Sequence, residues 1–293
     1  MLKRQILLLA LLEELGELSN TEMMKYLFLL TRYQDKKSYH FVPYKYGCFS
    51  FNAYADKRKL IERGILKDSD EWVLSEDQKG FYFMLPRENR SLITKIKKGF
   101  AHLQKQELIR YTYLKYPYYA VNSEILNEVL SAPEISQIKA CMPQNDMRAI
   151  YTIGYESRSI EEYINCLIKN DVKILCDVRK NPISRKYGFS KKTMSRALET
   201  VGIEYRHIPG LGIVGEKRKD LHDLEDYNRL FDLYEKEVLS SSSNLLKIIY
   251  ELLLENNRVG LTCFEKLPAY CHRTRAAEAV VRLFDRDLPI IEL

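Results

Sequence analysis

The stretch that decides the fold of the C-terminal half is LTCFEKLPAYCHRTRAAEAVVRLF, residues 261–284. The apolar run at its start indicates a buried strand, and apolar residues three and four positions apart after residue 272 indicate a helix. The turn between them carries more reactive side chains than a connector needs: Cys263, Glu265, Cys271, His272 and Arg273. Either this turn lines a site or the residue types are coincidental, and the neighbouring segments decide between the two.

Four more apolar runs accompany this strand: AIYTIGYE (149–156), VKILCDVR (172–179), IEYRHIP (203–209) and PIIEL (289–293). Helical patterns separate the five runs, at residues 159–169, 190–201, 227–255 and 272–283. Strands that alternate with helices predict a parallel sheet with helices on both faces. The runs are continuously apolar, which is typical of strands buried on both sides. We therefore predict an α/β, Rossmann-like three-layer domain over residues 147–293.

Polar side chains follow four of these five strands. Sites in open parallel sheets form beyond the carboxyl ends of the strands, so these residues are expected to meet at one edge. The candidate site residues are Tyr155, Asp177, Arg179, Asn181, Ser184, Arg185, His207, Cys263, Glu265, His272 and Arg273. A single polar strand end is weak evidence, but four together favour a site.

The motifs TIGYE, CDVRKNPISRKYGFS, GIEYRHIPGLG and LTCFEKLPAYCHR occur in this order between residues 149 and 284. In order and spacing they resemble the domain-of-unknown-function 488 family, whose signature is the closing Cys-His-Arg. The family has no well-established activity. The resemblance therefore implies a fold and a set of candidate residues, and it implies no reaction.

The N-terminal half, residues 1–140, is predicted to be mainly α. Helical patterns at residues 2–15 and after the capping residue Ser19 precede a third helix that ends at Gly64. Two short strands, ILK and WVLS, then follow at residues 65–67 and 72–75. Three helices before a small hairpin is the order of a winged helix-turn-helix, whose third helix can enter the DNA major groove.

The basic charge also lies in this half. Residues 1–140 hold 22 Lys and Arg against 17 Asp and Glu, whereas residues 141–293 hold 24 against 23. A basic half is the electrostatic footprint expected of a nucleic-acid-binding domain, although a merely solvated basic surface gives the same excess. The predicted DNA contacts are Lys45, Lys57, Arg58 and Lys59.

The segments FVPYKYGCFSFNAY (41–54) and YLKYPYYAVNSEI (113–125) resemble the winged-helix region of Panacea-type antitoxin proteins. This resemblance implies a role in bacterial conflict systems, and hence in antiviral defence. Winged helices also serve as protein-binding modules, in which case the aromatic residues of this region would be core.

Several function classes are excluded or disfavoured. No apolar run approaches the 18 residues of a membrane span, and six cysteines without a C-x-x-C pair suit the reducing cytoplasm. GLGIVG (210–215) has the spacing of a dinucleotide motif, but a charged segment follows it where that motif needs an apolar helix, so we expect a flexible loop.

Cys263, Cys271 and His272 could in principle bind zinc. Their spacing fits no usual zinc knuckle and the sequence shows no fourth ligand, so we expect no metal and no cofactor. Catalysis by a cysteine nucleophile needs a base beside the thiol, and His272, adjacent to Cys271 in the sequence, would usually point elsewhere. We therefore expect the thiols to contribute packing.

The remaining carboxylates, arginines and histidine suit a phosphate-bearing ligand and chemistry at a sugar. We expect a metal-independent DNA glycosylase that excises a base, either unmodified or modified as in phage DNA, from a nucleotide extruded from double-stranded DNA. Asp177 is the first candidate for the catalytic carboxylate and Glu265 the second, assisted by His207 and Tyr155. The predicted substrate-binding residues are Arg179, Asn181, Ser184, Arg185, Cys263, His272 and Arg273.

Two alternatives stay open. Asp177 and Arg179 could form a structural ion pair at the strand end. The whole protein could also be a non-enzymatic sensor that binds modified DNA or a nucleotide. A nuclease is disfavoured, because no acidic metal-binding cluster of the usual kind is visible.

Overall fold

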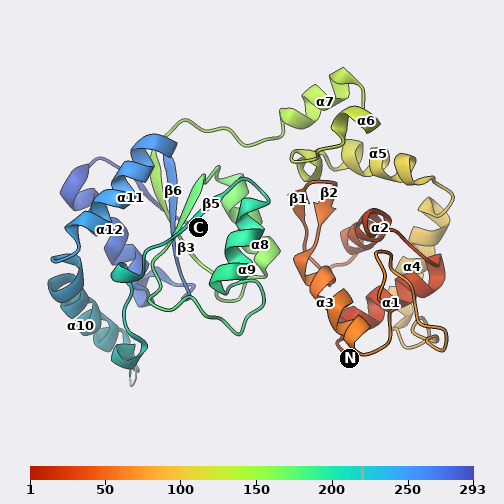
Figure 1. The fold of residues 1–293 in the computed structure, drawn as a ribbon, viewed down its shortest axis with the longest axis horizontal. Coiled ribbons are helices and arrows are strands. Elements are labelled where there is room, and N and C mark those ends of the chain that lie inside the picture. The colour runs from red at the N-terminus through yellow and green to blue at the C-terminus, as the bar shows by residue number, and fades with distance from the viewer. Residues whose placement is uncertain (219–220) are drawn as a thin grey trace. The chain divides into compact units, whose positions relative to one another are not determined.

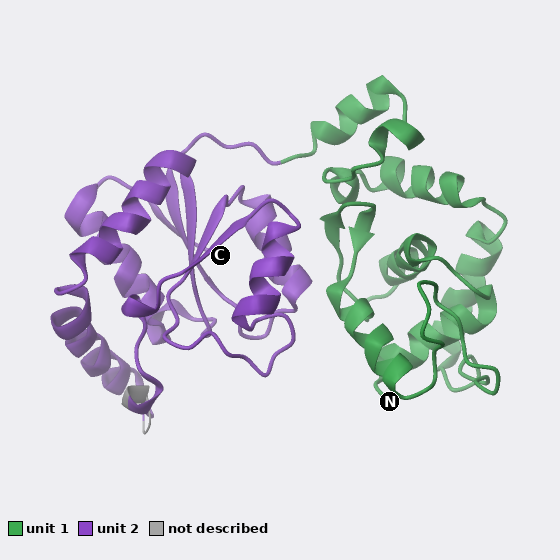
Figure 2. Cartoon of the chain, viewed as in Figure 1, with its two compact units in different colours: residues 1–142 green, residues 143–293 purple. Residues whose placement is uncertain are grey.

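The computed structural model describes residues 1–218 and 221–293. The chain divides into two compact units, residues 1–142 and residues 143–293 (Figure 2). The division falls inside the segment where the sequence indicates a linker. Two residues of the charged segment after GLGIVG, at positions 219 and 220, lie outside the described residues.

The C-terminal unit contains a five-stranded parallel sheet with the strand order β5-β4-β6-β3-β7 (Figure 1). The strands are β3 (Ala149–Gly154), β4 (Ile174–Asp177), β5 (Glu204–His207), β6 (Arg258–Cys263) and β7 (Ile290–Glu292). Every residue of β3, β4 and β6 is buried, as their continuous apolar runs predict. The α/β class with a parallel sheet is therefore confirmed.

Helices cover both faces of this sheet (Figure 1). They are α8 (Ile160–Lys169), α9 (Lys191–Glu199), α10 (Leu224–Tyr234), α11 (Ser243–Asn256) and α12 (His272–Phe284). On one face, Leu246, Ile249 and Val280 of α11 and α12 pack in one apolar cluster with Val259 and Leu261 of β6. The opposite face is covered by α8 and α9. Because all five strands run parallel, their carboxyl ends lie at one edge of the sheet.

The N-terminal unit is mainly α. Its elements are α1 (Lys3–Leu15), α2 (Asn20–Arg32), β1 (Val42–Tyr44), β2 (Gly47–Phe49), α3 (Phe51–Glu62), α4 (Arg87–Phe100), α5 (Lys105–Lys115), α6 (Leu126–Val129) and α7 (Ala132–Lys139). Ser19 caps α2 through the backbone of Glu22, and Gly64 has the positive φ of 68° that ends α3. In the described chain, no helix is both long and apolar enough to cross a bilayer.

The strands expected after α3 are reduced to single bridges. Leu66 pairs with Leu74, and Leu18 pairs with Trp72. A hairpin that the sequence did not predict, β1 with β2, stands instead between α2 and α3. The mainly α architecture is thus observed, and the winged-helix assignment stays a prediction.

The predicted DNA contacts on α3 need one correction. Lys57 is only 6% exposed, because its ammonium donates to the carbonyl oxygens of Ser69 and Asp70, each at 3.1 Å. It therefore stabilises the loop after α3 and faces away from solvent. Arg58 and Lys59 are exposed. Lys45, also predicted, is half-exposed and forms an ion pair with Glu124 at 3.1 Å.

Candidate functional site

A cavity of about 410 Å³ lies beyond the carboxyl ends of β3, β4 and β6. Its lining residues are Tyr155, Arg179, Lys180, Asn181, Ile183, Ser184, Arg185, Ile213, Gly215, Cys263, Phe264, Glu265 and His272. Eight of the eleven candidate residues are thus brought together. Three are not in the lining: Asp177, His207 and Arg273.

Two glycines let the loops of this site approach one another. A Cβ atom on Gly154 would lie 1.8 Å from the carbonyl oxygen of Glu265, and one on Gly212 would lie 2.2 Å from the amide nitrogen of Lys180. Any larger residue would push these loops apart. The segment 210–215 is also anchored, because Leu211 is buried and its carbonyl accepts a hydrogen bond from Tyr234 at 2.7 Å. Leu211 is thus held in place, and the flexible loop expected for this segment stays a prediction.

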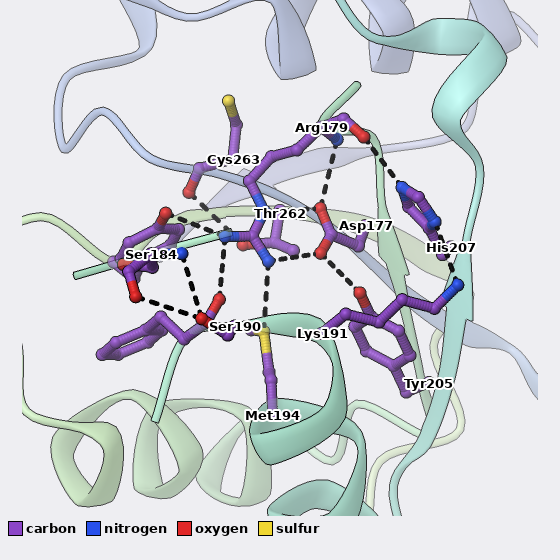
Figure 3. A network of polar contacts seen from close by, with 12 residues as sticks. Asp177, Arg179, Ser184, Ser190, Lys191, Met194, Tyr205, His207, Thr262 and Cys263 are labelled. Atoms are coloured by element: carbon purple, nitrogen blue, oxygen red, sulfur yellow. Dashed lines mark hydrogen bonds and ion pairs between the residues drawn. The ribbon is translucent and has the colours of Figure 1, made fainter. Parts of the chain in front are cut away.

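Asp177 forms a buried ion pair (Figure 3) and is not among the cavity-lining residues. The Arg179 guanidinium donates to both carboxylate oxygens, from Nε at 2.8 Å and from Nη2 at 2.5 Å. Tyr205 donates a third hydrogen bond, at 2.6 Å, and the side chain of Asp177 is fully buried. The structural ion pair is therefore the arrangement present, and the first choice for the catalytic carboxylate is corrected.

Arg179 links this ion pair to the cavity wall. Its Nη1 donates to the Tyr155 hydroxyl at 2.8 Å and to the Phe189 carbonyl at 2.9 Å. The Tyr155 ring stacks on Phe189 with the centroids 4.4 Å apart. Burial lowers the pKa of Arg179. The hydrogen bonds and the charge of Asp177 raise this pKa by a larger amount, so it lies above its ordinary value. Arg179 and Tyr155 thus form a rigid, charged inner wall.

His207 and Arg273 hold the backbone around the cavity. The His207 Nε2 atom lies 2.9 Å from the carbonyl oxygen of Arg179, as Figure 3 shows. Arg273 is fully buried and donates to the carbonyls of Glu265 at 2.5 Å and Lys266 at 3.1 Å. Both residues position loops, so the catalytic role expected for His207 and the substrate contact expected for Arg273 are not what the geometry favours.

The outer wall of the cavity is basic. Lys180, Asn181 and Arg185 are exposed, and in the described part of the chain no hydrogen bond or ion pair occupies the side chains of Lys180 and Arg185. The loop that carries Arg185 is closed by Ser190, whose hydroxyl donates to the Ser184 carbonyl at 3.0 Å. A firmly held loop with two cations and no described acidic partner is suited to an anionic ligand.

Glu265 is the one carboxylate among the cavity-lining residues. Its Oε2 atom accepts a hydrogen bond from the Cys263 thiol at 3.3 Å. The same sulfur lies 3.6 Å from His272 Nδ1, and His272 Nε2 lies 3.0 Å from the Val178 carbonyl oxygen. Because a carbonyl can only accept, Nε2 carries a proton, and in the neutral ring Nδ1 then presents its lone pair to the sulfur.

Cys271 completes this cluster. Its sulfur, the Cys263 sulfur and a His272 ring nitrogen lie within 4.8 Å of one another, and all three residues are buried. Burial raises the pKa of the Cys271 thiol well above its ordinary value, and the neighbouring Cys263 raises it further. Glu265 lies beside this cluster, so a further potential ligand is present that the sequence spacing did not indicate.

Several lining residues were not predicted from the sequence: Lys180, Ile183, Ile213, Gly215 and Phe264. Lys180 and Phe264 each stand between two residues that were assigned to the site, so the loop position was a usable signal. Ile183 and Ile213 carried none, because apolar residues in a loop are common in any globular protein.

Residues 159–280 match the family model "Domain of unknown function DUF488". The resemblance that the motifs predicted for the C-terminal half is confirmed. No curated protein and no solved structure matches the chain. The Panacea-type resemblance of the N-terminal half stays a prediction. DUF488 supplies no activity, so the function is inferred from the cavity itself.

Proposed function

We propose that the protein is a DNA glycosylase: the cavity takes one nucleotide extruded from DNA, and Glu265 promotes hydrolysis of its N-glycosidic bond. The observation that carries this proposal is the composition of the cavity wall, in which one carboxylate faces a space bordered by the available cations of Lys180 and Arg185. An anionic substrate and a reacting carboxylate can therefore meet in the same cavity.

The size and lining of the cavity support a nucleotide as the ligand. A volume of about 410 Å³ lies within the range of small-molecule sites. Phe264 is 44% exposed, and its ring packs edge-on against Tyr155 at 5.3 Å. An aromatic ring held in this way offers a surface on which a base can stack. Arg185 would then bind the phosphate through its guanidinium.

The position of Glu265 in the cavity wall supports this role. Glycosidic hydrolysis passes through a transition state with positive charge on the sugar, which a nearby carboxylate stabilises while it activates water. The loss of one such electrostatic contact typically slows an enzyme by about 10²–10³-fold. Glu265 replaces Asp177 in this role, because the carboxylate of Asp177 is buried and occupied by Arg179 and Tyr205.

The N-terminal unit would hold the duplex. We base this part on its net basic charge, on the exposed Arg58 and Lys59, and on the winged helix that the sequence predicts for this half. A target base in a duplex must leave the stack before a glycosidic bond can be reached, so an enzyme of this kind needs both a duplex-binding surface and a cavity. The Panacea-type resemblance adds the proposal that the DNA belongs to an infecting phage.

The test is base release. Full-length protein would be incubated with plain duplex DNA and with duplex DNA containing modified phage bases, followed by alkali, which cleaves the abasic sites. We expect strand breaks with at least one modified substrate, a loss of about 10²–10³-fold in Glu265→Gln, and unchanged rates in Glu204→Gln, an exposed carboxylate on β5.

Two results would contradict this proposal. Unchanged base release in Glu265→Gln would remove Glu265 from the reaction. Selective binding of one modified DNA by a wild-type protein that releases no base would favour the sensor, the alternative left open by the sequence.

A further inference from the structure

We propose that Cys263, Cys271 and His272 bind one divalent metal ion, most suitably zinc, at the floor of the cavity, with the remaining coordination position open to the cavity. Two of these residues, Cys263 and His272, line the cavity, while Cys271 lies behind them. The three potential ligand atoms lie within 4.8 Å of one another in a buried environment. This inference goes beyond the proposed glycosylase and holds whichever bond the enzyme breaks.

The separation of the ligand atoms matches a tetrahedral zinc site. Bond lengths of about 2.3 Å for Zn–S and about 2.1 Å for Zn–N place sulfur and nitrogen roughly 3.6 Å apart on one edge of a tetrahedron. The Cys263 sulfur and His272 Nδ1 are 3.6 Å apart. A thiol that is hydrogen-bonded to an imidazole has a similar sulfur–nitrogen separation. The distance is therefore a requirement for a zinc site, and the surroundings of the three residues distinguish the two arrangements.

The surroundings of His272 orient it as a ligand. Its Nε2–H donates to the Val178 carbonyl at 3.0 Å, which leaves the Nδ1 lone pair directed at the cluster. Its ring also packs edge-on against Tyr234 at 5.6 Å. Metal-binding histidines almost always donate their second nitrogen to a carbonyl or a carboxylate in this manner, which fixes both tautomer and orientation.

The N-terminus of a helix adjoins the cluster. Cys271 is the N-cap and His272 the first residue of α12, a helix of 13 residues. The positive end of a helix dipole favours negative charge on a ligand set at this place. Two buried thiolates would be costly alone, whereas a divalent cation neutralises both. Sulfur and imidazole ligands together select zinc over magnesium or calcium.

The fourth coordination position would leave the metal open to water or substrate. Two cysteines and one histidine hold catalytic zinc in other enzymes, which keep the fourth position for water or substrate. Here that position would face the cavity, where Glu265 lies 3.3 Å from the Cys263 sulfur. A water on the metal would thus lie beside the carboxylate that we assign to the reaction.

Metal content and cobalt substitution test this site on the full-length protein, purified with a reductant and without a chelator. We expect about one zinc per chain. Cobalt(II) should replace the zinc and give a thiolate-to-cobalt charge-transfer band together with the visible bands of a tetrahedral complex. Cys271→Ser should lower zinc affinity by more than about 100-fold, beyond the loss typical of an outer partner. Cys166→Ser, a half-buried thiol on α8 outside the cluster, is the matched control.

The wild-type spectrum decides the outcome even if Cys271→Ser does not fold. Protein without zinc that also shows no cobalt–thiolate band would overturn the proposal, as would equal metal affinity in Cys271→Ser and Cys166→Ser. These readouts do not involve DNA. Metal binding without base release would therefore refute the glycosylase and leave the metal site standing.

Discussion

The substitution Asp177→Asn should destabilise the C-terminal unit strongly. The carboxylate receives hydrogen bonds from Arg179 Nε, Arg179 Nη2 and the Tyr205 hydroxyl, and its side chain is fully buried. An asparagine keeps the shape but removes the charge, and its NH₂ group faces donors instead of accepting from them. A buried ion pair broken on one side costs about 3–5 kcal/mol. For a unit of this size that corresponds to a decrease of roughly 6–20 °C in Tm.

Urea unfolding of the full-length protein can measure this effect with two probes. The sequence has one tryptophan, Trp72, which is buried in the N-terminal unit, so its fluorescence reports that unit alone. Far-UV circular dichroism reports both units. In Asp177→Asn we expect an early transition by circular dichroism and an unchanged transition by fluorescence. Tyr205→Phe removes one hydrogen bond to a charged group and should cost less, about 1.5–3 kcal/mol.

The double variant Asp177→Asn with Arg179→Met provides the decisive comparison. If the large cost comes from an uncompensated buried guanidinium, removal of the guanidinium should recover part of it, and the two changes should not be additive. A single Asp177→Asn change within about 0.5 kcal/mol of wild type would refute this reasoning, because that is the range of ordinary surface substitutions. In that case, any loss of base release in Asp177→Asn would again count as evidence for catalysis.

Two other regions give predictions that simple measurements check. Charge reversal at Arg58 and Lys59 should weaken DNA binding across sequences and reduce the dependence on salt by about one unit of slope per lost phosphate contact, measured by fluorescence anisotropy at several salt concentrations. Lys57→Met should instead lower the stability of the N-terminal unit, followed by tryptophan fluorescence, because its ammonium holds two loop carbonyls. Gly154→Ala should lower the Tm of the C-terminal unit by overpacking, at a cost of about 1–3 kcal/mol, since the new Cβ would lie 1.8 Å from a backbone oxygen.

Matched controls separate these effects from general damage. Lys247→Glu changes an exposed cation on α11 of the C-terminal unit and should leave DNA affinity unchanged. Gly215→Ala adds a methyl group to a glycine of the same cavity with nothing within 4 Å, so its Tm should match the wild type. Equal DNA affinity in the charge-reversed and wild-type proteins, or equal Tm changes in the two glycine variants, would contradict the corresponding prediction.

The sheet could be predicted because its strands are buried on both faces. Continuous apolar runs such as that of β6 leave few alternatives to a parallel sheet, and a parallel sheet in turn fixes which strand ends meet. For this reason the sequence located the edge that carries the cavity. It could not show which side chains at that edge face the cavity, because this depends on how each chain turns after its strand.

Asp177 and Arg179 illustrate that limit. Only one residue separates them, and the buried Val178 lies between. The backbone amide of Arg179 donates to the Asp177 carboxylate at 3.1 Å, which bends the chain so that the guanidinium returns to the same carboxylate. If the chain left β4 without this bend, both side chains would point outward. The sequence spacing of Asp177 and Arg179 is the same with and without the bend.

Lys57 is a different case, because the sequence did contain the signal. Ala53 and Leu60, four residues before it and three after it, are both buried, so Lys57 lies on the inward stripe of α3. Helical periodicity thus separates Lys57 from Arg58 and Lys59 without any structure. The assignment of all three to DNA relied on their charge and on their place in the third helix, and overlooked the phase of the helix.

The Cys271-His272 pair shows why adjacency in sequence misled the search for chemistry. Neighbouring residues within a helix point about 100° apart, so a cysteine and a histidine in sequence rarely act on one another. Here Cys271 is the N-cap, which has extended backbone, and His272 begins the helix. The change of backbone conformation between them lets both side chains reach toward Cys263, which comes from β6. The third potential ligand, Cys263, therefore stands eight positions before Cys271 on another element. The strand–turn–helix geometry of residues 258–284 brings it close to the other two.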